Sequence, residues 1–149
     1  MNTDKQTLIE FLCEAKKNTY AAQQNEVRGT RPTSHDFLYE KDDLKYIDTY
    51  LGSEQFVGEE ALWEDNVPVW GLNYTGRATS PDFDISVLKE ALKKSTPEYP
   101  YRGPKVFVKG DYTYKCRVEG DFEWFVGCEK IMYKGEKVYE SMFQGGLIK

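Results

Sequence analysis

At 149 residues the chain has the commonest size of a single domain, and it can bury a core without disulfides or metal ions. Its 25 Asp and Glu outweigh 20 Lys and Arg to give a net charge of −5, and no basic stripe offsets them, which argues against direct nucleic-acid binding. No segment has the length and apolarity of a membrane span or the form of a signal peptide, so we expect a soluble, cytoplasmic protein that does not contact membranes.

The spacing of the three cysteines matches neither a set of disulfides nor a zinc site. Cys13, Cys116 and Cys128 are odd in number, far apart and embedded in apolar runs. Paired disulfides and zinc sites need closer or even sets, so we expect all three to be reduced, free of metal and mostly buried.

The first expected element is a helix. Apolar residues recur at helical spacing from Leu8 to Ala15, and Thr3 with Gln6 can form a capping box at the N-terminus. Residues 23–34 are polar and contain glycine and proline, which favours a loop.

Aromatic and β-branched residues then predict an antiparallel meander of four strands separated by short polar turns. The expected strands are residues 35–39, 44–51, 55–63 and 67–76.

A second helix and a second meander follow. Ser80 and Pro81 suit the N-cap and first position of a helix, whose apolar face continues to Leu92. The strands expected after it are residues 106–108, 112–118, 122–133 and 137–144. The fold class predicted is therefore α+β, with two main helices packed on an antiparallel sheet.

The order of elements suggests an internal repeat. Residues 56–60, Phe-Val-Gly-Glu-Glu, align with residues 125–129, Phe-Val-Gly-Cys-Glu. We interpret the chain, residues 1–149, as one domain of two tandem units, about 1–79 and 80–149, that pack about a pseudo-twofold axis with a ligand crevice between them. The alternative is that aromatic-rich strands with glycine turns resemble one another by composition alone.

The repeat singles out Glu60 and Glu129, which occupy the same position of equivalent strands among apolar neighbours. A half-buried carboxylate needs a partner, so each should either bind a ligand or form a structural bond to an arginine such as Arg102 or to a tyrosine. Aromatic residues at matched positions are the candidates for the crevice walls: Phe56, Trp70, Tyr74, Phe125, Tyr139 and Phe143.

Catalytic motifs are missing from the sequence. Ser34, His35 and Asp36 are adjacent on an extended chain and point to alternate faces, so they cannot form a triad, and we assign His35 and Asp36 structural roles. His35 is the only histidine, and nucleotide, zincin and hydrolase motifs are lacking. The sequence therefore predicts no catalytic residues, no metal and no cofactor.

Six short strings stand out in the sequence: residues 34–36, 46–52, 56–60, 100–104, 110–114 and 120–122. Together they resemble a bacterial family of domains of uncharacterised function. The family is found alone or at the C-terminus of Xre-type helix-turn-helix regulators, and it carries no established activity. The resemblance implies an effector-sensing or dimerising module, similar in broad plan to the GyrI-like effector-binding domains, which hold cationic, often aromatic ligands beside a glutamate.

These observations favour a non-catalytic, sensor-like domain that binds a small cationic or aromatic ligand in an aromatic crevice with central glutamates. The alternative is an interaction module that binds a protein partner or forms a homodimer through an exposed sheet face or edge. The third hypothesis is an enzyme of unrecognised type.

Overall fold

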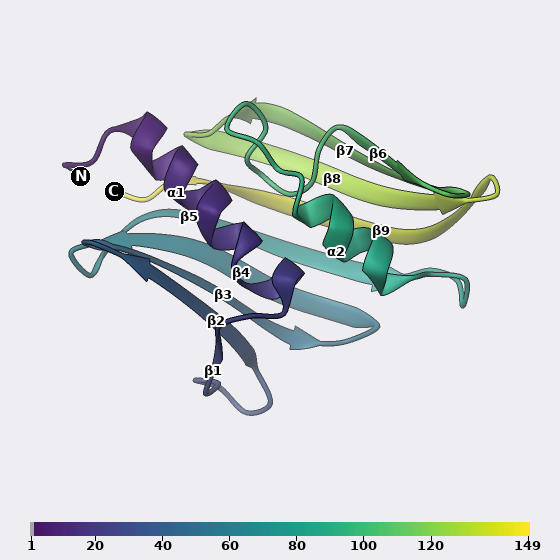
Figure 1. The fold of residues 1–149 in the computed structure, drawn as a ribbon, viewed down its shortest axis with the longest axis horizontal. Coiled ribbons are helices and arrows are strands. Elements are labelled where there is room, and N and C mark those ends of the chain that lie inside the picture. Colours follow the sequence, from purple (N-terminus) through teal and green to yellow (C-terminus); the bar gives the residue numbers. More distant parts are fainter. Residues whose placement is uncertain (1) are drawn as a thin grey trace.

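The computed structural model describes residues 2–149, and within them the chain forms two α-helices, a short 3₁₀ helix and nine strands (Figure 1). In chain order the elements are α1 (Lys5–Lys17), η1 (Tyr20–Ala22), β1 (Glu26–Val27), β2 (His35–Lys41), β3 (Leu44–Gly52), β4 (Gln55–Glu64), β5 (Val67–Ala78), α2 (Ile85–Leu92), β6 (Val106–Lys109), β7 (Tyr112–Asp121), β8 (Trp124–Tyr133) and β9 (Glu136–Leu147).

All strands belong to one antiparallel sheet with the order β1-β2-β3-β4-β5-β9-β8-β7-β6. The meander β2–β5 and the meander β6–β9 meet at the centre, where β5 pairs with β9. Both helices lie across one face of this sheet (Figure 1), and their buried side chains join those of the sheet in a single core. The α+β class is as predicted, and each helix is followed by the four predicted strands, with η1 and the short β1 in addition in the first half.

The helix starts differ from the prediction because aspartates act as caps. Asp4, not Thr3, caps α1 by accepting a hydrogen bond from the backbone N–H of Thr7 at 2.9 Å. Asp84 caps α2 in the same way, so that α2 begins at Ile85 instead of after Ser80.

The segment expected to be a loop contains a strand. β1 pairs with β2 over only two residues, Glu26 and Val27, and η1 precedes it. Two residues are too few to show a period-2 pattern, so hydrophobic alternation could not have indicated this strand.

Large rings fill the core beneath the helices. Trp70 is fully buried and stacks on Phe122 and Phe125, with ring centroids 5.1 and 5.9 Å apart. Its indole N–H donates to the carbonyl of Phe122 at 3.0 Å, which satisfies the polar group that burial would otherwise leave unpaired.

The expected burial of the cysteines holds for two of the three. Cys13 and Cys116 are buried, whereas Cys128 is exposed. Cys128 precedes Glu129 on β8, and since neighbouring residues of a strand point to opposite faces, the burial of Glu129 turns Cys128 outward.

No helix within residues 2–149 combines the length and apolarity that crossing a membrane requires.

Candidate functional site

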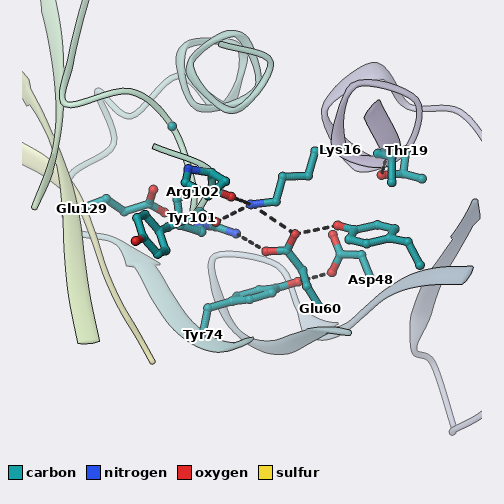
Figure 2. Close-up of polar contacts among 12 residues, drawn as sticks. Lys16, Thr19, Asp48, Glu60, Tyr74, Tyr101, Arg102 and Glu129 are labelled. Atoms are coloured by element: carbon teal, nitrogen blue, oxygen red, sulfur yellow. Dashed lines mark hydrogen bonds and ion pairs between the residues drawn. The ribbon is translucent and has the colours of Figure 1, made fainter. Parts of the chain in front are cut away.

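Five charged side chains lie in the core between the sheet and the helices (Figure 2). They are Lys16 on α1, Asp48 on β3, Glu60 on β4, Glu129 on β8 and Arg102 in the segment after α2. Each is at most 7% exposed. Such side chains are almost never buried unless paired, so their contacts decide what the cluster can do.

Glu129 has a complete set of partners. Its Oε1 accepts hydrogen bonds from Arg102, at 2.8 Å from Nη2 and 3.2 Å from Nε, and from the Tyr139 hydroxyl at 2.8 Å. Its Oε2 accepts from the Tyr114 hydroxyl. Burial opposes ionisation, but Arg102 and these hydroxyls outweigh it and lower the pKa of Glu129, so the carboxylate is charged and compensated.

Glu60 is less well satisfied. Its Oε1 accepts from the Tyr46 hydroxyl at 2.6 Å and lies 3.6 Å from Lys16 Nζ. Its Oε2 lies 3.7 Å from Arg102 Nη1 and has no hydrogen-bond partner within residues 2–149. The cluster therefore holds a buried carboxylate oxygen that only ion pairs reach.

Asp48 adds a second acid beside Glu60, because the two residues face each other directly in the β3–β4 pairing. The Tyr74 hydroxyl donates to Asp48 Oδ1 at 2.6 Å (Figure 2). Burial, and then the charge of Glu60, raise the pKa of Asp48 to about 7. Asp48 is consequently divided between its neutral and charged forms near neutral pH.

Two cations lie among these three acids. Lys16 Nζ donates to the carbonyl of Pro100 at 2.9 Å and to that of Tyr101, which fixes the segment that carries Arg102. The Arg102 guanidinium also lies 4.7 Å from the centre of the Tyr74 ring. When Asp48 is ionised the cluster has three negative and two positive charges, so it carries one uncompensated negative charge.

A cavity of about 350 Å³ lies beside the cluster, between the first meander and α2. Tyr74 and Arg102 belong to both the cavity wall and the cluster. Burial raises the pKa of Tyr20 and of Tyr50, and the charge of Asp48 adds to the rise in both. Asp48 also contacts the cavity wall directly, through its hydrogen bond from Tyr74. Five aromatic rings line the cavity: Tyr20, Tyr50, Phe56, Tyr74 and Phe83.

The aromatic candidates from the sequence divide into two groups. Phe56 and Tyr74 line the cavity. The other four pack in the core: Trp70, Phe125, Tyr139 and Phe143.

The two glutamates point into the core instead of lining this cavity, so they reach it only through Arg102 and its neighbours. Arg102, taken from the sequence as a structural partner, bonds to Glu129 and forms an ion pair with Glu60.

The Ser34–Asp36 string forms no triad. The Asp36 carboxylate accepts hydrogen bonds from the hydroxyls of Ser34, Thr49 and Thr30 at 2.8–3.0 Å, which ties the loop before β2 to β3. His35 lies on the opposite side of the strand, at the cavity mouth, with Nδ1 3.0 Å from Glu26 Oε2.

Two residues of the cluster, Lys16 and Asp48, were not predicted from the sequence. Asp48 could have been found, because the period-2 rule places it on the same face as Tyr46 and Tyr50, among aromatic neighbours. Lys16 gives no such signal, since it looks like an ordinary cation in the last turn of a helix.

No group of three or more His, Cys, Asp or Glu side chains in residues 2–149 is placed to hold a metal ion.

Comparison with known proteins places the chain in a family. Searches of curated proteins and of solved structures found no match. The model of a domain of unknown function, DUF5680, matches residues 48–148, which include Asp48, Glu60, Arg102 and Glu129. The match covers well over half of the sequence, and the chain therefore belongs to the DUF5680 family of domains of unknown function.

Proposed function

We propose that the protein is a cytoplasmic, non-catalytic domain that binds a small aromatic cation in the cavity of about 350 Å³. The observation that supports this function is the adjacency of two features. Five aromatic rings line the cavity, and the buried cluster behind its wall carries more carboxylates than cations.

The rings favour a flat, positively charged ligand. An ammonium group over the face of a tyrosine or phenylalanine gains about 0.5–2 kcal/mol per contact when it is partly desolvated. The cavity also has the size of a small-ligand site. An aromatic ligand can therefore pack between the rings of the meander and those next to α2.

The charge of the cluster favours a cation over an anion. Arg102 and Lys16 are paired with Glu129 and Glu60, so the uncompensated charge is that of Asp48. Asp48 accepts a hydrogen bond from the hydroxyl of Tyr74, a residue of the cavity wall. In this proposal Glu60 and Glu129 do not contact the ligand. They position Arg102 and contribute to the negative charge of the cluster, which the ligand neutralises.

Three probes of similar size test this function: 2-phenylethylammonium, 2-phenylethanol and 3-phenylpropanoate. Titration by NMR should give chemical-shift changes at Tyr50, Phe56 and Tyr74, with the cation binding tightest and the anion weakest. Ala78→Trp, which adds a large side chain at the cavity wall, should abolish these shifts. Tightest binding of the anion would assign the site to Arg102 and Lys89 instead and would contradict the proposal.

We also infer that the two meanders descend from a duplicated unit. Tyr46 donates to Glu60, and Tyr114, on the corresponding strand, donates to Glu129. The two hydroxyl–carboxylate pairs occupy matching places in β3–β4 and β7–β8.

Matched glycines support the same inference. A Cβ on Gly58 would lie 2.3 Å from the Tyr74 ring, and one on Gly127 would lie 2.4 Å from the Phe143 ring. Each meander thus leaves room for an aromatic ring at the same point. Two unrelated meanders that shared only an aromatic-rich composition would not be expected to match in this way.

The biological role that we propose for binding is sensing. This part depends on the resemblance of the sequence to bacterial domains that accompany Xre-type regulators.

A further inference from the structure

The face of the sheet opposite the helices carries a groove of about 1100 Å³. Its lining residues come from β3, β4, β5, β9, β8 and β7, so the groove runs across six strands. At about 4.8 Å between strands this corresponds to a length of roughly 24 Å. Glu129 is among the residues that line the groove, but its carboxylate is bonded to Arg102, Tyr114 and Tyr139 in the core.

One wall of the groove is a row of mainly cationic side chains. Lys115, Lys130, Glu140 and Arg77 are consecutive cross-strand partners on β7, β8, β9 and β5. Glu140 forms an ion pair with Arg77 at 2.9 Å and a second ion pair with Lys137, also at 2.9 Å.

The other wall is mainly apolar. Cys128, Met142, Thr75 and Val57 are cross-strand partners in the next row, on β8, β9, β5 and β4. Met142 is 70% exposed and Val57 is 49% exposed. Apolar side chains with this exposure gain free energy when a partner covers them.

The charges in the groove run against the charge of the whole protein. Six cations line it, although the chain has a net charge of −5. They are Arg77, Lys105, Lys115, Arg117, Lys130 and Lys137. Two acids are among the lining residues: Glu140 lies in the cationic row, and the carboxylate of Glu129 is buried and paired with Arg102.

The pair Lys115 and Lys130 indicates which kind of group the groove would bind. They face each other directly across β7 and β8, and like charges in that position destabilise a sheet. Within residues 2–149 neither ammonium forms an ion pair. An anionic group between them would remove the repulsion.

We propose that this groove binds an acidic, amphipathic peptide segment of a partner protein, with its acidic side on the lysine row and its apolar side on Met142 and Val57. An elongated occupant with an acidic and an apolar side matches two parallel rows that each cross several strands. A second copy of the chain packed through this same groove would place cations against cations. Single-stranded nucleic acid needs exposed rings on which bases stack, whereas this wall is built from Met, Val and Thr.

The test is selection from a phage-displayed library of random peptides of about 16 residues, which as a helix span roughly 24 Å. Counter-selection uses Lys115→Gln/Lys130→Gln protein. Enriched peptides should contain Asp and Glu beside apolar residues at regular spacing, and a synthetic copy should bind the double variant roughly tenfold more weakly, as expected for two lost ion pairs. The matched control Lys17→Gln/Lys93→Gln makes the same change in charge at exposed positions away from the groove, and it should bind normally.

Two further measurements separate binding from folding. The Lys115→Gln/Lys130→Gln protein should unfold at the same or a higher temperature, because a repulsive pair is removed. Bound peptide should also slow the reaction of N-ethylmaleimide with Cys128, the cysteine that is exposed in the groove, and Met142→Glu should weaken binding.

The proposal is overturned if no peptide is enriched over the counter-selection, or if enriched peptides lack an acidic excess or bind the double variant equally well. Displacement of the peptide by a single-stranded oligonucleotide or by anionic phospholipid vesicles would assign the groove to those ligands instead. The cavity proposed for 2-phenylethylammonium lies on the other face of the sheet. Failure of the phenylethylammonium titration would therefore leave the peptide proposal unaffected, and failure of the peptide selection would leave the cavity proposal unaffected.

Discussion

Glu60 and Glu129 occupy matching strands, and each accepts a hydrogen bond from a matching tyrosine, yet their surroundings differ. Both oxygens of Glu129 are hydrogen-bonded, and Arg102 neutralises its charge. Glu60 shares that arginine at a longer distance and leaves one oxygen without a hydrogen bond in the described chain. The Glu129 carboxylate is thus fully hydrogen-bonded, whereas the Glu60 carboxylate has one oxygen still to satisfy.

Two positions create this difference. Asp48 faces Glu60, whereas Cys116 faces Glu129. Tyr74 supplies a hydroxyl to Asp48, whereas Phe143 at the matching place supplies none. The extra acid and hydroxyl lie on the side where the cavity is found. Incomplete compensation in a protein core is expected at a functional site, so the comparison favours the first half as the binding half.

The largest effect should come from Glu129→Gln. It removes the main partner of Arg102 and leaves a buried guanidinium without full compensation, which should lower the free energy of unfolding by about 3–5 kcal/mol. Urea denaturation measures the loss. The control Glu119→Gln, at an exposed ion pair, should change it by less than about 1 kcal/mol. Equal effects for the two variants would show that the Glu129 network is not structural.

Asp48→Asn should have an intermediate effect of opposite sign. Because the pKa of Asp48 is raised in the folded chain, its contribution to stability is present at low pH and is lost as the pH rises toward and beyond about 7. Asn keeps an acceptor for Tyr74 without the charge, so it should raise the free energy of unfolding at pH 8 by about 1–3 kcal/mol. The gain should vanish near pH 4. A variant that is less stable than wild type at pH 8 would contradict the assignment.

Glu60→Gln should have the smallest effect on stability, about 1 kcal/mol, because ionised Asp48 can then balance Lys16 and Arg102. Its clearer consequence is electrostatic. With the neighbouring charge removed, the pKa of Asp48 should fall from about 7, although burial keeps it above its usual value. Carbon-13 NMR of the Asp48 carboxyl group follows this titration, and an unchanged midpoint would show that the two acids do not interact.

The sequence was sufficient for the elements but not for the cluster. Hydrophobic period and turn residues predicted both helices and the eight long strands, and period 2 placed Glu60 and Glu129 on the inner face. Arg102 comes from an irregular segment, and only tertiary packing brings it between two glutamates of different meanders. The unequal compensation of the two acids depends on such distances, and no local pattern encodes them.

The pH dependence of 2-phenylethylammonium binding, measured by isothermal titration calorimetry at pH 6 and pH 8, shows directly whether the charge of Asp48 attracts the ligand. An alkylammonium stays charged over this range. A group with a pKa of about 7 is roughly ten times more ionised at pH 8 than at pH 6. If the ligand neutralises the charge of Asp48, its affinity should therefore rise roughly tenfold between these pH values. In the Asp48→Asn protein the affinity should be weak and independent of pH. Affinity that is equal at both pH values in the wild-type protein, or unchanged in the variant, would contradict the account.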